Sequence, residues 1–498
     1  MRSSFPTLKA TNLKTALVEG NKVISYAALN LRCDRFASGL LNGNVSGKAD
    51  LEEERIAFFM PASIDYVTTM HGIWRAGGIA VPLNVASAVT ELEHYLTSAS
   101  VSRMIANGDY RASLVDLCAA LNIELLSVDD IITDEAATLP AIAPERRAMM
   151  LFTSGTTNKP KGVVSTHKTI AAQITTLLDA WQWSENDAIP LFLPVHHIHG
   201  IINILSCGLW AGATVDLFGK FDMPEICAKV AAKRYNVFMA VPTIYVKLLQ
   251  FFDTLAKDEV AKITAGFRAM RLNISGSAAC PVKLFEQWQA LTDQVLLERY
   301  GMTEIGMGLS NPYVGERRAG HVGQALPGVD AQLFDEAHTP ILEENIPGEI
   351  RIKGDNVFLE YWNNETATKE SFIDGWFCTG DVAVLDKGYF RIMGRSSVDI
   401  IKSGGYKLSA LEIEGTLLTH DDIAEVAVIG VEDETWGESV SAFVVLKPNK
   451  TLTYVDLKGW CDGKMSGYKI PKALHVVDSL PRNAMGKVTK PALKALAS

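Results

Sequence analysis

Residues 151–164, LFTSGTTNKPKGVV, constrain the fold and the chemistry of this chain more than any other stretch. Leu151 and Phe152 are typical of the end of a buried strand, and a glycine turn with four hydroxyl groups follows them. Glycine lets the backbone approach an anion closely, and hydroxyls, amides and the two lysines after the turn suit phosphate oxygens. No Gly-Lys-Ser/Thr closes the turn, so it is not a Walker loop. We therefore favour a phosphate-binding turn over a plain surface loop.

The composition is that of an ordinary globular enzyme with more than one domain. A chain of 498 residues exceeds what one hydrophobic core usually supports. Hydrophobic residues make up 48% of the chain and charged residues 21%. The 47 basic and 57 acidic residues give a net charge of −10, which argues against a nucleic-acid partner and leaves local basic pockets for anionic ligands.

Cysteine usage and hydropathy predict a soluble protein in a reducing compartment. The seven cysteines are scattered and never spaced as Cys-x-x-Cys, so we expect free thiols, no disulfide framework and no zinc site. No long apolar window indicates a membrane span or a signal peptide. Residues 1–18 contain Arg2, Lys9 and Lys14 but no acid. We read them as a frayed terminus of a cytoplasmic protein; the alternative is a transit segment, which would place the mature protein in the mitochondrial matrix.

Apolar strands and amphipathic helices alternate through the first part of the chain. Strands are expected at 55–60 and 79–84, and a helix between them at 64–76 is ended by Gly77 and Gly78. A further strand is expected at 104–107. This order predicts an α/β fold, with a large N-terminal domain of parallel, αβ-layered sheets.

Three later strands each end in residues suited to ligand binding. They run into the loop PVHHIHG at 194–200, the turn SGSAA at 275–279 and the stretch ERYGMTE at 298–304. Because the carboxyl ends of parallel strands meet at one edge of a sheet, we expect a shared crevice there. The three histidines also raise a metal hypothesis, but no carboxylate or cysteine accompanies them locally. An imidazole presented to a ligand is the interpretation we favour.

The pattern of expected secondary structure changes twice in the second half of the chain. From about Gly320, short strands and turns predict an antiparallel or mixed β-subdomain, in which Asp381 follows a glycine turn. After a polar stretch, an α+β pattern continues to the end. We therefore predict a large domain at 1–394, a linker at 395–399 and a small α+β domain at 400–498. Lys487 lies in a polar loop of this domain and, by itself, reads as a solvated charge.

These motifs occur in an order that resembles the adenylate-forming superfamily of acyl-CoA synthetases, adenylation domains and luciferases. The resemblance covers nearly the whole chain and rests on TSGTTNKPKG, the His197 loop, SGSAA, YGMTE, WFCTGD, the GR linker, GGYK and PRNAMGKV. More narrowly, LERYGMTE, VGQALPGV, GRSSVDIIKSGGYKLSALEIE and LPRNAMGKV are similar to malonyl-CoA synthetases, especially those of eukaryotic type.

The resemblance implies a two-step reaction with ATP, Mg²⁺ and coenzyme A. A carboxylate and ATP give acyl-AMP and pyrophosphate, and the thiol of coenzyme A then displaces AMP. The β- and γ-phosphates would contact Lys161 and the turn residues Thr153, Ser154, Gly155, Thr156 and Thr157. Asn158 departs from the glycine usual in this loop, but asparagine tolerates positive φ, so the turn can survive.

The resemblance also assigns the remaining nucleotide contacts. Glu304 would hold Mg²⁺, and Thr303 would contact the α-phosphate. Asp381 would accept from the ribose hydroxyls, with Arg395 nearby. The adenine would lie between Gly276, Ser277, Ala278 and Tyr300.

In this superfamily the small domain rotates between the two steps, and the resemblance gives each orientation its residues. Lys487 would bridge the carboxylate and the α-phosphate during adenylation, and Asp399 is the hinge candidate. Lys487, Thr303 and His197 are therefore the expected catalytic residues. In the second orientation the pantetheine tunnel would be formed by Gly404, Gly405 and Tyr406.

Arg299 indicates the class of acid. It stands directly before the YGMTE motif, where a guanidinium suits a second carboxylate through a bidentate pair and has no use beside an apolar chain. In malonyl-CoA synthetases the matching arginine, histidine and serine form this pocket, which implies Arg299, His197 and Ser277 here. The alternative is that Arg299 serves AMP or Glu298.

The expected function is a malonate–CoA ligase that also admits methylmalonate. A CoA ligase for a short or medium-chain monocarboxylic acid is the alternative within enzymes. An enzyme that loads a carrier protein, and a non-catalytic nucleotide-binding regulator, remain as further alternatives. The oligomeric state is not predicted.

Overall fold

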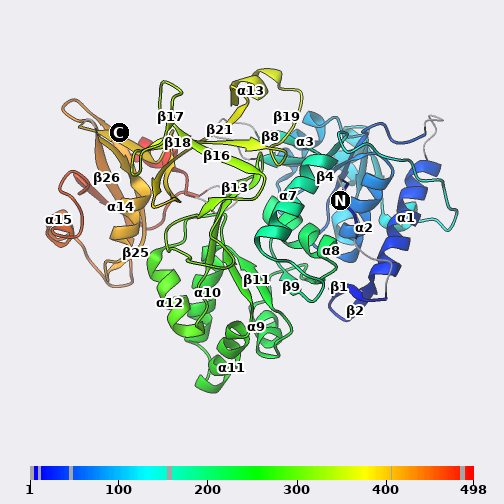
Figure 1. Ribbon diagram of the computed structural model, residues 1–498, viewed down its shortest axis with the longest axis horizontal. Helices are drawn as coiled ribbons and strands as arrows, with labels where there is room; N and C mark the ends of the chain where they lie inside the picture. The colour runs from blue at the N-terminus through cyan, green and yellow to red at the C-terminus, as the bar shows by residue number, and fades with distance from the viewer. Residues whose placement is uncertain are drawn as a thin grey trace.

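The computed structural model describes residues 5–8, 13–43, 49–153, 160–404, 406–482 and 488–497. Four sheets with their helices build a large unit, and a fifth sheet belongs to a small unit near the carboxyl terminus. In Figure 1 the small unit lies to the left of the large one, in orange and red. This mixed α/β architecture, with a large N-terminal part and a smaller C-terminal part, confirms the predicted fold class.

A seven-stranded sheet forms the centre of the N-terminal part, in the order β19-β8-β7-β4-β3-β5-β6. The five strands β7, β4, β3, β5 and β6 are parallel, whereas β8 pairs antiparallel with β7 and with β19. The strands are β3 (Arg55–Phe58), β4 (Ile79–Pro82), β5 (Arg103–Ile105), β6 (Glu124–Leu126), β7 (Arg147–Thr153), β8 (Lys161–Thr166) and β19 (Glu360–Tyr361).

Six helices accompany this sheet, and α1, α2 and α6 begin at a serine that caps the helix. Ser25 and Ser63 accept from backbone amides at the starts of α1 and α2, which leaves the apolar faces of these helices free to pack on each other and on the sheet. The helices are α1 (Tyr26–Asn42), α2 (Ile64–Arg75), α3 (Val89–Ser98), α4 (Gly108–Ala112), α5 (Val115–Ala120) and α6 (Val128–Ile131).

A four-stranded sheet of order β2-β1-β10-β9 adjoins the first sheet through α7. Its strands are β1 (Thr15–Glu19), β2 (Lys22–Ser25), β9 (Ala188–Leu191) and β10 (Thr214–Leu217). The connection from β9 to β10 is helical, with a π-helix at its start. The helices are α7 (His167–Ala180), η1 (His199–Ser206) and α8 (Cys207–Ala211).

A five-stranded sheet of order β11-β12-β13-β14-β15 carries two of the ligand-type strand ends. Its strands are β11 (Val237–Ala240), β12 (Leu272–Ser275), β13 (Leu297–Met302), β14 (Gly306–Ser310) and β15 (Gln324–Ala325). The third strand end is alongside, because the amide of Asn236 donates to the carbonyl of Ala188 in β9. The helices at the bottom of Figure 1 are α9 (Met223–Ala231), α10 (Pro242–Phe252), α11 (Lys257–Arg268) and α12 (Val282–Thr292).

An antiparallel sheet confirms the predicted β-subdomain. Its order is β17-β16-β18-β21-β20, and β22 also pairs with β21. The elements are β16 (Val329–Phe334), β17 (Pro340–Ile341), β18 (Gly348–Gly354), α13 (Glu365–Glu370), β20 (Phe372–Ile373), β21 (Trp376–Asp386) and β22 (Tyr389–Arg395).

The small unit is an α+β sandwich around the sheet β24-β23-β26-β25, with β27 parallel to β26. It has its own apolar clusters, centred on residues such as Ile413, Val428 and Ala442. Its elements are β23 (Ile400–Ser403), β24 (Tyr406–Ser409), α14 (Ala410–Leu417), β25 (Ile423–Asp433), β26 (Gly437–Leu446), α15 (Tyr454–Cys461), β27 (Ala473–Val476) and α16 (Lys490–Ala497).

Two segments differ from the sequence-based expectation. The strand expected to end at Leu297 continues to Met302, because β14 pairs with it antiparallel across a register shift at Tyr300 and Gly301. The loop expected after β9 winds into η1 from His199 onward. Both differences arise from tertiary packing, which local patterns do not encode.

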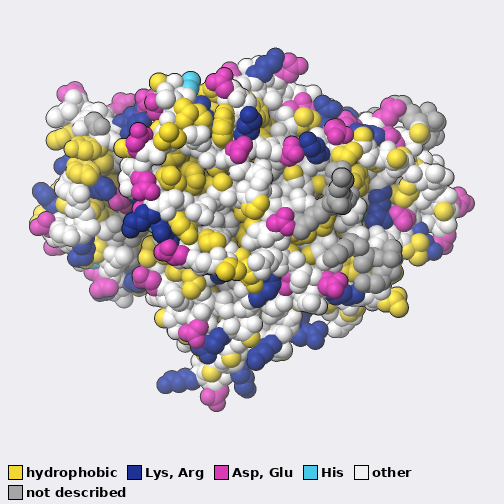
Figure 2. Space-filling model, viewed as in Figure 1, with side chains coloured by type: hydrophobic (Ala, Val, Ile, Leu, Met, Phe, Trp, Pro, Cys, Tyr) yellow, Lys and Arg dark blue, Asp and Glu magenta, His cyan; other side chains and the backbone are white. Residues whose placement is uncertain are grey.

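The surface and the cysteines agree with a globular protein of modest charge. On the face shown in Figure 2, acidic and basic side chains are interspersed among apolar ones. All seven cysteines are free thiols. In the part of the chain that the structure describes, no helix is long and apolar enough to cross a membrane.

His167 provides a test of packing in the large unit. It is fully buried against Phe5, and burial lowers its pKa from 6.5 to about 3. The unfolded chain therefore binds more protons between these two pH values, and His167 reduces the free energy of unfolding by about 1.4 kcal/mol per pH unit as pH falls below the unfolded pKa.

We expect His167→Phe to reduce the loss of stability on acidification from about pH 7 to about pH 5, measured by urea unfolding. Phenylalanine keeps the stacked ring and removes the two buried nitrogens, neither of which has a partner among the described residues. An acid dependence identical to that of the wild type would contradict this account.

Candidate active site

The β7–β8 hairpin presents the two ends of the predicted phosphate loop. Thr153 closes β7 and lies opposite Lys161 at the start of β8. The ammonium of Lys161 lies 4.7 Å from the ring centroid of Tyr361. The loop residues between the strands lie outside the described part of the chain, namely Ser154, Gly155, Thr156, Thr157, Asn158 and Lys159.

Thr303 and Glu304 occupy the turn between β13 and β14, close to this hairpin. The Glu304 carboxylate is buried, and its Oε1 accepts from the Tyr361 hydroxyl at 3.0 Å. Burial raises the pKa of Glu304, whereas the charges of Arg395 and Lys161 oppose the rise. Tyr361 therefore contacts both the buried carboxylate of Glu304, through its hydroxyl, and the ammonium of Lys161, through its ring.

Asp381 is held in place by two side chains from different strands. It lies opposite Arg395 in the β21–β22 pair, and Arg395 Nε donates to its Oδ1 at 3.1 Å. The Tyr300 hydroxyl, from β13, donates to its Oδ2 at 2.6 Å. Burial, followed by the charge of Asp381, raises the pKa of Tyr300, so the phenol stays protonated and remains a donor. The backbone amide of Asp381 donates to Thr379, which fixes the turn before it.

Arg299 is buried without a carboxylate partner among the described residues. It is 4% exposed, and its Nε and one terminal nitrogen have no hydrogen-bond partner there. Burial lowers its pKa to about 9. An unpaired charge in an apolar setting is costly, so this guanidinium is suited to receive an anion.

Gly276 makes room for this guanidinium. A Cβ at Gly276 would lie 2.5 Å from Cζ of Arg299, so only glycine allows the arginine to pass so close to the backbone. Glu298, the neighbour of Arg299, lies on the opposite face of β13 and accepts from the Gly320 amide at 2.9 Å. Burial raises the pKa of Glu298 to about 8. Arg299 is thus not a partner of Glu298.

His199 joins the same cluster, although the sequence pointed to His197. Nδ1 of His199 lies 3.1 Å from Oγ of Ser277, and its Nε2 is buried without a partner among the described residues. Burial, then Arg299 and His197, hold the pKa of His199 well below its usual range, so the imidazole is neutral. His197 is half-buried, and its ring centroid lies 4.2 Å from that of His196.

Gly200, directly after His199, marks a tight turn, although the sequence by itself does not show which way that turn directs the histidine. A Cβ at Gly200 would lie 2.4 Å from the carbonyl oxygen of Pro194, so the chain folds back tightly at this glycine. The fold-back starts η1 and turns His199 toward Ser277. Ser277 itself has a φ of +68° and, with Ala278, lies at the exposed edge of the turn.

The predicted pantetheine residues lie on the small unit, in the β23–β24 hairpin. Gly404 has a φ of +56°, and a Cβ there would lie 2.9 Å from Trp436. The exposed ring of Tyr406 stacks on Tyr468 at 4.7 Å and 6°. Gly405 lies outside the described residues.

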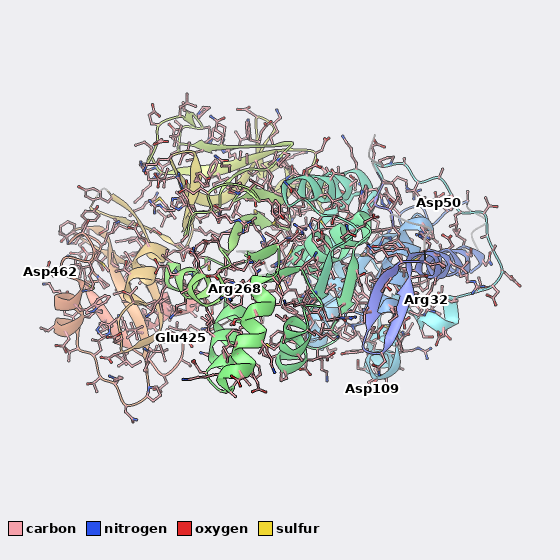
Figure 3. The ribbon with its side chains drawn as sticks, turned by 60° about the horizontal axis from the view of Figure 1, so that its bottom comes forward. Arg32, Asp50, Asp109, Arg268, Glu425 and Asp462 are labelled. Atoms are coloured by element: carbon pink, nitrogen blue, oxygen red, sulfur yellow. The ribbon has the colours of Figure 1, made fainter. Side chains whose placement is uncertain are left out.

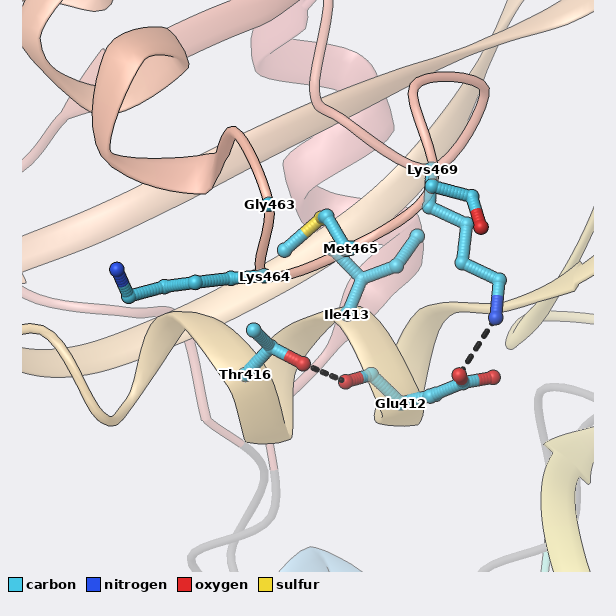
Figure 4. Close-up of a pocket in the computed structure, with 8 residues that line it drawn as sticks. Glu412, Ile413, Thr416, Gly463, Lys464, Met465 and Lys469 are labelled. Atoms are coloured by element: carbon cyan, nitrogen blue, oxygen red, sulfur yellow. Dashed lines mark hydrogen bonds and ion pairs between the residues drawn. The ribbon is translucent and has the colours of Figure 1, made fainter.

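The small unit also contains a polar cavity of about 480 Å³ (Figure 4). It opens between α14 and residues 463–469, and Lys469, next to Tyr468, lies in it 2.5 Å from Glu412. None of the predicted site residues lines it.

Lys487 also lies outside the described residues, but the residues that flank its loop are described. We call these flanking residues, 481–482 and 488–489, the neck of the loop. Arg482 and Val488 form an antiparallel bridge, and the amide of Thr489 donates to the carbonyl of Pro481 at 2.8 Å. Arg482 also pairs at 2.5 Å with Glu425, which Figure 3 labels on the small unit.

Comparison with known proteins identifies the family. The model of the AMP-binding enzymes matches residues 7–362, and that of the AMP-binding enzyme C-terminal domain matches residues 412–487. The chain is 42% identical to the mitochondrial malonate–CoA ligase ACSF3 of Mus musculus over 89% of this chain and 81% of that protein. It is 36% identical to the malonate–CoA ligase of Arabidopsis thaliana, over 95% and 83% of the two chains.

A solved structure gives the same relationship. ATP-bound MatB from Rhodopseudomonas palustris is similar with a TM-score of 0.87 and 34% identity, over 97% of this chain and 96% of that chain. Since both family models and these relatives span the two units, the chain belongs to the AMP-binding enzymes and, within them, to the family of the malonate–CoA ligases.

Proposed function

We propose that this protein is a malonate–CoA ligase that works through malonyl-AMP. The observation that carries the proposal is the buried guanidinium of Arg299, which has no carboxylate partner among the described residues. A dicarboxylate supplies that partner with one carboxylate while the other reacts. The relatives named as malonate–CoA ligases support the same substrate.

The acid pocket that we propose combines charge with a neutral donor. Arg299 binds the carboxylate that does not react. Ser277 and His199 lie at the edge of the pocket, with His197 nearby. If the Ser277 hydroxyl donates to Nδ1 of His199, Nε2 carries the proton and is free to donate to the same carboxylate. A neutral imidazole adds this hydrogen bond without repelling the guanidinium.

In the first step, a carboxylate oxygen of the acid attacks the α-phosphorus of ATP, and pyrophosphate leaves. Thr153, residues 154–157 and Lys161 bind the β- and γ-phosphates, and Thr303 contacts the α-phosphate. Asp381 accepts from the ribose hydroxyls while Tyr300 and Arg395 hold it in position. The adenine lies against the turn formed by Gly276, Ser277 and Ala278 and the ring of Tyr300.

Glu304 fits the magnesium site that this reaction needs. Mg²⁺ commonly takes one or two carboxylates and completes its shell with phosphate oxygens and water. Oε1 of Glu304 accepts from Tyr361, and its second oxygen is not used in that contact. When bound, the metal would neutralise charge on the β- and γ-phosphates. Among the described residues, no group of three or more His, Cys, Asp or Glu side chains is placed to hold a metal, so phosphate oxygens and water would complete the shell at Glu304.

The second step needs a different orientation of the small unit. The thiol of coenzyme A attacks the acyl carbonyl of malonyl-AMP, malonyl-CoA forms and AMP leaves. We place the boundary of the large domain at residue 394 and the small domain at 400–498, with Asp399 of linker 395–399 as the hinge. Lys487 serves the first orientation, and Gly404, Gly405 and Tyr406 form the pantetheine tunnel in the second.

The proposal extends to related acids and to location. A methyl branch on the central carbon leaves both carboxylates available, so we propose that methylmalonate is also accepted. Some relatives are named as mitochondrial, which supports a mitochondrial rather than a cytoplasmic location for this chain. Malonate, ATP and coenzyme A are the proposed small-molecule partners.

The decisive experiment compares acids in one assay. Pyrophosphate release and CoA thioester formation are measured with malonate, methylmalonate, acetate and octanoate, with free coenzyme A as the thiol. We expect malonate to have the highest kcat/KM. Octanoate or acetate ahead of malonate would refute the assignment, and acyl-AMP formation without a CoA thioester would indicate a carrier-loading enzyme.

Arg299→Ala tests the acid pocket. We expect kcat/KM for malonate to fall roughly 30- to 5,000-fold, because truncating one partner of a buried charge pair typically costs about 2 to 5 kcal/mol. The KM for ATP should stay unchanged, since the guanidinium does not contact the nucleotide in our assignment. Arg268→Ala, at the exposed end of α11 (Figure 3), is the matched control. Unchanged malonate turnover in Arg299→Ala would contradict the pocket.

Lys487→Ala tests whether this lysine acts in adenylation but not in thioester formation. We expect it to block pyrophosphate release while thioester formation from supplied malonyl-AMP continues, because the ammonium is needed only while charge develops on the α-phosphate. Rapid-quench measurement of each half-reaction distinguishes the steps. An equal loss in both would argue against a rotating small domain.

A further inference from the structure

Lys490 forms a buried ion cluster that the proposed reaction does not use. It is the first residue of α16, and its Nζ lies 2.6 Å from Oδ1 of Asp399 and 2.7 Å from Oε1 of Glu414. The three side chains are 10%, 15% and 14% exposed, respectively. Burial opposes the charge of Lys490, but the two carboxylates outweigh it and raise the pKa of the lysine, so it stays charged.

The Asp399 carboxylate closes the turn of the linker. Its Oδ2 accepts from the backbone amide of Arg395 at 3.0 Å, while its own amide donates to the carbonyl of Arg395 at 2.8 Å. A Cβ at Gly394 would lie 2.3 Å from Cβ of Asp399, so glycine is required for this approach. Asp399 thereby uses one oxygen for the linker and the other for Lys490.

The same turn reaches the nucleotide site. The side chain of Arg395 donates a hydrogen bond to Asp381, the residue proposed to accept from the ribose hydroxyls. A continuous line of polar contacts therefore runs from Asp381 through Arg395 and Asp399 to Lys490.

Lys490 also follows, in sequence, the loop that carries Lys487. The bridge between Arg482 and Val488 and the bond from Thr489 to Pro481 close the neck of that loop, and Lys490 is the next residue. Glu414 fixes the other side of the cluster, because its Oε1 also accepts from the Val428 amide of β25 at 2.7 Å. The neck is therefore tied both to the small unit and to the linker.

We infer that Lys490 is a positioning residue that sets the Lys487 loop relative to the linker and the ribose carboxylate during adenylation. This inference rests on the proposed role of Lys487. The ammonium of Lys490 touches no substrate; it acts by holding the neck against Asp399 while Arg395 holds Asp381. Because a displacement of about 1 Å in a reacting group can cost about 100-fold in rate, loss of this contact should affect the step that uses Lys487.

The test is Lys490→Met, with the two half-reactions measured separately. We expect kcat for pyrophosphate release to fall about 10- to 100-fold with little change in the KM for ATP. Thioester formation from supplied acyl-AMP should stay within about threefold of the wild type, since Lys487 takes no part in it. Lys490→Arg keeps the charge and should recover most of the lost rate.

Two further variants separate positioning from a general loss of stability. Lys494→Met, one turn later in α16, removes a lysine that pairs with Glu438 at 3.5 Å and should leave both half-reactions unchanged. Asp399→Asn should lower pyrophosphate release as Lys490→Met does, and the double variant should be no slower than the slower single variant, because both remove one contact.

Several outcomes would overturn the inference. These are equal losses in both half-reactions, additive effects of Lys490→Met and Asp399→Asn, or unchanged pyrophosphate release in a folded Lys490→Met protein. Should Lys490→Met fail to fold, the same comparison is made with Asp399→Asn and Lys490→Arg. The assays use whichever acid gives the highest wild-type rate, so failure of malonate as substrate would refute the substrate assignment without deciding the role of Lys490.

Discussion

The unpaired guanidinium of Arg299 is the constraint on which the rest of the site depends. Keeping a charge buried without a partner opposes folding, and the surrounding packing must offset that cost. Strand β13 fixes the backbone of Arg299, Gly276 leaves space for the side chain, and neutral His199 adds no competing charge. A bound carboxylate would provide the missing partner, so the fold itself favours an acid with a second carboxylate.

Polar contacts within the large unit are buried, whereas a contact between the two units is exposed. Asp381 and Glu304 are buried and bonded to tyrosines, which suits groups that must stay fixed through both steps. Between the units, the Glu336 carboxylate lies 2.9 Å from Lys407 and is largely exposed to solvent. Exposed pairs of this kind contribute at most about 1 kcal/mol, so such a contact is compatible with rotation. The buried cluster at Lys490 joins the small unit to its linker.

Most of the architecture could be predicted because its elements are locally consistent. The alternation around α2 and β4, the short strands after Gly320 and the α+β pattern after the linker all appear where they were expected. The register shift in β13, the π-helix and helix α16 were not predicted. Their formation depends on partners distant in sequence, such as β14 for the extended strand and the Asp399–Glu414 pair for the start of α16.

The sequence by itself determined the order of the motifs and the chemistry of their side chains, and these placed the chain among the AMP-binding enzymes and pointed to Arg299. It could not determine which histidine meets Ser277, because tight folding at Gly200 turns His199 inward. Nor could it show that Glu298 and Arg299 face opposite sides of β13, or that Lys490 reaches the linker. Side-chain direction and burial depend on the packing of distant segments, so only the tertiary structure decided these contacts.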